Sequence, residues 1–258
     1  MNVYQLSETQ ILIFALVLLR MIGFVFSAAI FSMPSVSAPL KVLFCLILTM
    51  TLYPFVKVGP EVTAGFGENL VLLAGREIIV GLILGFLTRL FFFAVSMTGE
   101  LISISLGLSS AQLYNPMMAS QGGVIEQFHV IIGSMFFLLL NGHHILLSAL
   151  AQSFDLIGVG VLSLKTGPLA EMAVFGQDLL VLTLKMSAPV LVSILVANLA
   201  MGILGRAIPQ INVLVTSFPV TIMLGLIVMF VGVPLFVFEM NGLVDITATK
   251  LMQVLKTL

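Results

Sequence analysis

The sequence predicts an all-α integral membrane protein, with about six long hydrophobic helices arranged as helical hairpins. Of its 258 residues, 60% are hydrophobic and only 8% are charged, and the mean hydropathy is +1.24. Soluble domains usually carry about 25% charged residues. The composition of this chain makes membrane lipid the expected surrounding of the protein. The net charge of −1 gives no indication of a nucleic-acid partner. Cys45 is the only cysteine, which excludes an internal disulfide.

Six hydrophobic blocks follow one another along the chain, at about 11–31, 40–56, 70–95, 124–150, 178–205 and 211–238. Most of them reach the roughly 20 residues that a spanning helix needs, and the second is at the short limit. The first block is read as a retained span rather than a signal peptide. It contains Arg20, and no Lys or Arg precedes it to form a positive n-region.

The connecting segments predict two hairpins. Prolines in the short first connector make the first two blocks a pair, and the turn at 205–212 joins the last two. Pro219 and Pro234 are expected to kink the returning helix. The mixed segment 151–177 is expected to be a loop with a short amphipathic helix.

The third block carries charged and small residues at four-residue steps: Glu77, Gly81, Gly85 and Arg89. Glycines four apart let a second backbone approach closely. Arg76 and Glu77 are too costly to face lipid alone, so each is expected to meet a partner charge or a polar cavity. The residues leave open whether this face packs within the chain or against another subunit.

The fourth block opens with Glu126 and His129, three residues apart, and closes near His143. Glu-x-x-His occurs in carboxylate-bridged metal sites, but those need a second such pair, which the sequence lacks. We therefore predict no metal and no cofactor, and interpret the histidines as polar caps. No P-loop, nucleophile elbow, Rossmann fingerprint or metalloprotease helix occurs, so no enzymatic activity is predicted. A metal-dependent membrane enzyme using these three residues is kept as an alternative.

The stretch 97–123 differs from the blocks around it. It is rich in Gly, Ser, Gln and Asn and holds a single charge, Glu100. Irregular backbone at membrane depth must be covered by protein or line a cavity. The residues favour a pore plug and a packed re-entrant segment equally. A small-solute secondary transporter with a midplane binding segment is a further alternative, although the sequence lacks a matching interrupted helix in a second half.

Several stretches together resemble the FliR family of the flagellar type III export gate and the related SctT proteins of injectisomes. They are LLR at 18–20, Pro39-Leu40-Lys41, VGLILGF at 80–86, Gly99-Glu100 followed by LGLSSAQLYNP at 106–116, Asn141-Gly142-His143, and GRAIPQINVLVTSFP at 205–219. One departure is Asn115 before Pro116, where family members tend to carry Asp.

The resemblance implies one copy of this chain in a helical gate built with several P and Q subunits (FliP and FliQ) and with FlhB. The gate lies in the bacterial inner membrane, at the flagellar basal body, and passes unfolded export substrates. Residues 1–258 would form a single subunit, with a P-like part over 1–150 and a Q-like hairpin and C-terminal end over 178–258.

The resemblance also implies that the segment near 106–122 plugs the closed pore. Small side chains would allow close packing in a narrow lumen, methionines would supply soft contacts, and glycines would give a hinge. The expected plug residues are Leu106, Gly107, Leu108, Ser109, Ser110, Ala111, Gln112, Leu113, Tyr114, Asn115, Pro116, Met117, Met118 and Gly122. The expected subunit-packing residues are Glu77, Gly81, Gly85, Arg89, Arg206, Pro209, Gln210 and Asn212.

Overall fold

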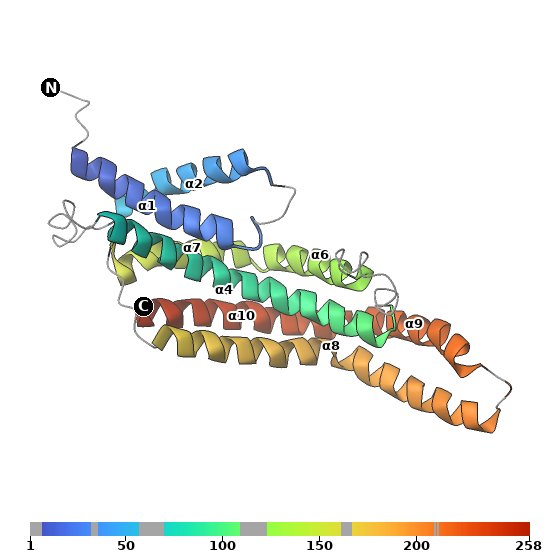
Figure 1. Ribbon diagram of the computed structural model, residues 1–258. Coiled ribbons are helices and arrows are strands. Elements are labelled where there is room, and N and C mark those ends of the chain that lie inside the picture. Colours follow the sequence, from blue (N-terminus) through green and yellow to red (C-terminus); the bar gives the residue numbers. More distant parts are fainter. Residues whose placement is uncertain are drawn as a thin grey trace. The chain divides into compact units, whose positions relative to one another are not determined.

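The computed structural model describes residues 7–31, 36–56, 70–108, 123–160, 167–208, 210 and 212–258. Within these ranges every regular element is a helix and no strand occurs, which confirms the predicted all-α class (Figure 1). The elements are α1 (Glu8–Ser27), α2 (Ala38–Leu52), the 3₁₀ helix η1 (Tyr53–Phe55), α4 (Leu70–Ser105), α6 (Val124–Leu139), α7 (Gly142–Ile157), α8 (Gly167–Ala207), α9 (Val213–Val231) and α10 (Val233–Thr257).

Four stretches of this described part are long and apolar enough to cross a membrane: α1, α2 with η1, α4 and α8. Two bent pairs, α6 with α7 at 65° and α9 with α10 at 61°, raise the number to six if each pair is one span. The prediction of six hydrophobic blocks therefore agrees with the upper count. In the sixth block a kink was predicted at Pro219 and at Pro234; the bend lies at Gly232, two residues before Pro234, and Pro219 lies inside α9. In the fourth block the chain bends at Asn141, between α6 and α7.

The two breaks have local causes in the backbone. Between α6 and α7, Asn141 adopts φ 56°, a left-handed conformation that Asn tolerates better than most residues. Between α9 and α10, Gly232 separates the helices, and Pro234 lies in the first turn of α10. A proline there needs no intrahelical donor, so Pro234 begins a helix and does not kink one.

Four helices extend beyond their predicted bounds. Helix α4 continues to Ser105 and α7 to Ile157, and α8 and α10 are longer as well. Helix α8 begins at Gly167, so residues 167–177 form its first turns and not part of a loop. Helix α10 continues to Thr257, where Leu251 and Val254 are buried. The extensions of α8 and α10 carry more polar residues than the blocks they continue, which is why hydropathy alone placed the start of α8 too late and the end of α10 too early.

The chain divides into two compact units, each described by itself. The first unit contains Met1–Leu90, Gly142–Gly176 and Ile246–Leu258. In it α1 and α2 form the predicted hairpin, with the Phe31 and Phe44 ring centroids 4.8 Å apart. Its core includes Met21, Phe24, Leu84, Leu150 and Val254.

The second unit contains Phe91–Asn141 and Gln177–Asp245. Its core is a cluster of Ile102, Leu106, Ile125, Val190 and Ile194, against which Val228 and Met229 pack. The two units do not follow the division at 1–150 and 178–258 that the resemblance implies. That division concerns likeness to other subunits, and it stays a prediction.

Candidate functional site

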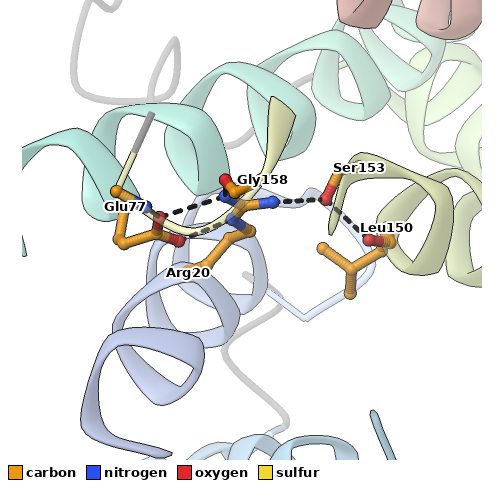
Figure 2. A network of polar contacts seen from close by, with 6 residues as sticks. Arg20, Glu77, Leu150, Ser153 and Gly158 are labelled. Carbon is orange, nitrogen blue, oxygen red and sulfur yellow. Dashed lines mark hydrogen bonds and ion pairs between the residues drawn. The ribbon is translucent and has the colours of Figure 1, made fainter. Parts of the chain in front are cut away.

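The first unit holds a fully buried ion pair between α1 and α4 (Figure 2). Arg20 Nε donates to Glu77 Oε2 at 2.7 Å, and Nη2 donates to Oε1 at 3.1 Å. The two side chains are 0% and 1% exposed. This two-bonded arrangement matches the planar fork of a guanidinium to a carboxylate, which is the strongest geometry for such a pair.

The remaining donors of Arg20 reach α7 and the residues that follow it. Nη1 donates to Ser153 Oγ at 3.0 Å, and that hydroxyl donates onward to the Leu150 carbonyl at 2.7 Å. Nη2 also donates to the Gly158 carbonyl at 2.8 Å. The Phe154 ring lies 4.1 Å from the guanidinium carbon, close enough for a cation–π contact. A single α1 side chain therefore binds three different parts of the α7 region.

The Glu77 carboxylate is satisfied from the same region. The Gly160 amide donates to Oε1 at 2.6 Å, and the neighbouring Arg76 donates through Nη1 to the Gly160 carbonyl at 3.0 Å. Gly158 and Gly160 have φ of 62° and 74°, which only glycine adopts without strain. The charges of α1 and α4 thus hold the turn after α7 in a conformation that its glycines permit.

This network, called here the Arg20–Glu77 network (Arg20, Glu77, Ser153, Gly158 and Gly160), confirms that Glu77 meets a partner charge. A charge buried in an apolar helix is stable only when it is paired and its other hydrogen-bonding atoms are satisfied. Sequence reasoning missed the roles of Ser153 and the two glycines. The available signal was that Arg20 and Glu77 are opposite charges inside separate apolar blocks.

Beside this network, α1 and α4 cross at glycines. A Cβ at Gly81 would overlap the main-chain carbonyl of Arg20, and one at Gly85 would overlap Ser27 Oγ and lie 2.7 Å from the Phe24 carbonyl. The close approach that glycines four apart predict therefore occurs within one chain. Packing of these glycines against another subunit stays untested, and Arg89 lies on the exposed side of α4.

The Ser153 hydroxyl gives a first test of the network. Ser153→Ala removes the acceptor of Arg20 Nη1 at a buried position, so the free energy of unfolding is expected to fall by about 1–3 kcal/mol. Ser148→Ala is the matched control, because Ser148 lies in the same helix and makes the same kind of bond to the Ile145 carbonyl, but is exposed. It should change stability by less than about 0.5 kcal/mol. Thermal denaturation of the purified full chain in detergent measures both, and equal losses would contradict the assignment.

In the second unit, Glu126 has one partner in α4 and one at the start of its own helix, and His129 has its partner in the preceding turn of α6. Glu126 accepts from the Ser96 hydroxyl and, at 3.2 Å, from the Gly123 amide at the start of α6. His129 Nδ1 lies 2.8 Å from the Ile125 carbonyl and must donate to it, because a carbonyl only accepts. Among the described residues no group of three or more His, Cys, Asp or Glu side chains comes together. The lack of a metal site over the whole chain stays a prediction.

The second unit also contains a partly open pocket of about 610 Å³. Its walls come from α4, α6, α8, α9 and α10 and are almost wholly apolar, with His129 the polar exception. A polar solute would find few partners there, because specific small-molecule sites place several polar groups around the ligand. The pocket therefore does not favour the transporter alternative.

The predicted plug begins within the described residues and continues outside them. Leu106 is buried, Gly107 has φ 79°, and Leu108 is exposed. Side-chain atoms of Leu106 lie against the position that a Cβ on Gly225 would take. Ser109, Ser110, Ala111, Gln112, Leu113, Tyr114, Asn115, Pro116, Met117, Met118 and Gly122 lie outside the described residues.

The predicted packing residues between α8 and α9 are largely exposed. Arg206 and Gln210 face outward, and Pro209 lies outside the described residues. Asn212 caps α9, because its Oδ1 accepts from the Val215 amide at 3.4 Å. The exposed side chains leave this corner open to a partner, and its role in assembly stays a prediction.

Long apolar helices that cross at glycines and hold a buried ion pair define the class: a membrane-embedded protein built from helical hairpins. Residues 11–246 match the family described as bacterial export proteins, family 1. The flagellar biosynthetic protein FliR of Bacillus subtilis is 30% identical over 84% of this chain and 85% of its own length. The FliR proteins of Aquifex aeolicus and Escherichia coli are 27% and 28% identical, over 92% and 84% of this chain and 91% and 83% of their own lengths. The chain belongs to the FliR family of bacterial export proteins.

Proposed function

We propose that the chain is the R-type subunit of a flagellar type III export gate, with a structural and gating role in the pore that unfolded flagellar proteins enter. The observation that carries the proposal is the family match over residues 11–246, supported by relatives that are flagellar biosynthetic proteins. As a family member, the chain is a membrane-embedded component of the flagellar export apparatus. We place it in the bacterial inner membrane, at the basal body, and assign it a structural rather than an enzymatic role.

The partners in this proposal are FliP and FliQ subunits and FlhB. Support comes from apolar side chains that the chain itself leaves uncovered along α8 and α9, such as Leu199, Ile203 and Phe230. Asn198, a polar side chain, is exposed on the same stretch of α8. A polar group on an apolar helix is stabilised by a hydrogen-bonding neighbour more than by lipid tails, which favours protein cover.

The plug is proposed for the segment that begins at Leu106. The family resemblance of LGLSSAQLYNP supports it, as does the firm attachment of its first residue. Leu106 belongs to the buried core cluster of the second unit. A segment that is rich in small residues and whose first residue is anchored in the core is suited to act as a plug that closes a narrow pore to ions.

Deleting residues 110–116 tests the plug. The deleted chain is expected to assemble normally with FliP, FliQ and FlhB, measured by co-purification in mild detergent, and to raise ion leak across the inner membrane of expressing cells. A variant in which a Gly/Ser sequence of equal length replaces these residues separates loss of the plug from shortening of the connection. Normal assembly with an ion-tight membrane would show that the segment is no plug. Failure of the unaltered chain to co-purify with any of these subunits would overturn the gate proposal itself.

A further inference from the structure

A single positive charge lies midway along the most apolar part of α4. Between Glu77 and Glu100, Arg89 is the only charged residue. At 1.5 Å per residue, it lies about 17 Å along the helix axis from either of them. Apart from Arg89 the stretch between these two residues is uncharged, and it is about as long as the roughly 20 residues that span the hydrocarbon core. A helix that spans through it carries Arg89 at the centre of the bilayer.

Arg89 lies on a face of α4 that the chain itself leaves open. Ile79, Leu82 and Phe86 are 38%, 44% and 44% exposed, and Arg89 is exposed as well. These four residues, called here the Arg89 face, follow one another at steps of three, four and three. That spacing is the repeat with which one helix packs along another. Gly81 and Gly85, which contact α1, lie on the neighbouring stripe of α4, and Arg89 follows Gly85 by one turn.

Within the described part of the chain, Arg89 makes no hydrogen bond and no ion pair, whereas Arg20 donates hydrogen bonds to Glu77, Ser153 and the Gly158 carbonyl. An arginine at the centre of a membrane helix is costly unless it is paired or faces a polar cavity. Its distance from both ends of the apolar stretch prevents it from reaching lipid phosphates. A carboxylate from another protein chain at the same depth is the group that stabilises such a charge most strongly.

We propose that the Arg89 face docks a membrane helix of another export-gate subunit, which presents an Asp or Glu to Arg89 between apolar side chains. The inference rests on the proposed function and adds the chemistry of one contact. Arginine suits this contact better than lysine, because its planar fork bonds both oxygens of a carboxylate. The partner's apolar residues cover Ile79, Leu82 and Phe86.

Substitution of Arg89 in the full chain tests the contact through co-purification of the other subunits in mild detergent and through motility of the cells. Arg89→Leu is expected to lower recovery of the partner subunits about tenfold or more, the change expected for a loss of about 1.4 kcal/mol. Arg89→Lys should keep part of it. Lys185→Leu is the matched control, because Lys185 is also an exposed cation on an apolar helix but lies two turns from Asp178, near one end of its apolar stretch. It should leave recovery unchanged.

Charge reversal identifies the partner residue. Arg89→Glu is expected to abolish motility, and suppressors should change an Asp or Glu in a membrane helix of a co-purifying subunit to Lys or Arg. A benzoylphenylalanine at position 86 in the otherwise unaltered chain should cross-link to that same helix. This measurement does not depend on the stability of an Arg89 variant. Cross-links to lipid alone would overturn the proposal.

Different outcomes would contradict the Arg89 contact and the proposed function. If the unaltered chain co-purifies with the other subunits but Arg89→Leu and Arg89→Glu match it in recovery and motility, only the Arg89 contact is wrong. If the unaltered chain itself recovers no other subunit, the proposed function is wrong.

Discussion

Replacing Arg20 with methionine is expected to lower the free energy of unfolding by about 3–5 kcal/mol, the largest effect of any single substitution considered for this protein. The reason is that Glu77, 1% exposed, would lose its counter-charge, and Ser153 and the Gly158 carbonyl would lose their donors. The measurement is thermal denaturation of the purified full chain in detergent, with its abundance in the membrane as a second readout.

A second substitution separates the ion pair from simple packing. Adding Glu77→Leu to Arg20→Met removes the unpaired carboxyl group, so the double variant should recover most of the loss. Recovery should be incomplete, because the Gly160 amide and the Gly158 carbonyl would remain buried without their partners. If the double variant loses as much stability as Arg20→Met alone and Glu77→Leu alone lose together, the two residues are not energetically coupled.

The matched control is Lys250→Met. Lys250 and Glu171 also form an ion pair, at 3.3 Å, but their side chains are 14% and 35% exposed. Pairs that water reaches contribute about 0–1 kcal/mol, so this substitution should change stability little. A loss as large as that of Arg20→Met would show that burial is not what distinguishes the two pairs.

Replacing Gly81 with valine is expected to cost about 3 kcal/mol, the second large effect. A Cβ at Gly81 would overlap the Arg20 carbonyl and lie 2.9 Å from the Phe24 nitrogen. Both are main-chain atoms of α1, which cannot rotate away as a side chain would. The substitution therefore has to push α1 away from α4, and it disturbs the Arg20–Glu77 network at the same time.

Gly75→Val is the control for this prediction, because Gly75 lies in the same helix and a Cβ there would meet nothing within 4 Å. It should change stability by less than about 1 kcal/mol, the range of helix propensities between glycine and valine. Denaturation midpoints of the two variants decide the matter. Equal midpoints would mean that the crossing of α1 and α4 tolerates a side chain.

The fourth and sixth blocks show how far hydropathy predicts this fold. Both were correctly predicted as helical and apolar, because these properties depend on composition summed over neighbouring residues. The bend of the sixth block was predicted at Pro234 and lies at Gly232, two residues earlier, whereas the angle of the break at Asn141 was not predicted. A break depends on the dihedral angles of one or two residues, and these angles are stabilised by what packs on either side.

The candidate site was likewise predicted only in part from the sequence. The need of Glu77 for a partner followed from its sequence alone, since an isolated charge in an apolar helix is unstable. The identity of the partner did not, because Arg20 lies 57 positions away and Arg20, Arg76 and Arg89 all stand in apolar surroundings. The glycine spacing on α4 likewise indicated a close crossing without showing that α1 is the helix that approaches.

The sequence by itself determined the class of the protein, the apolar blocks, the glycine steps of α4 and the likeness to the FliR family, because all of these are properties of residues and their order along the chain. Only the tertiary structure decided which charge is buried with a partner and which stays exposed. Arg20 finds a carboxylate, a hydroxyl and a carbonyl that folding brings together from α4, α7 and the turn after α7. Arg89 lies on the exposed side of α4, where the described residues provide no hydrogen-bond or ion-pair partner, so an arginine is buried in one helix of this protein and faces outward in another.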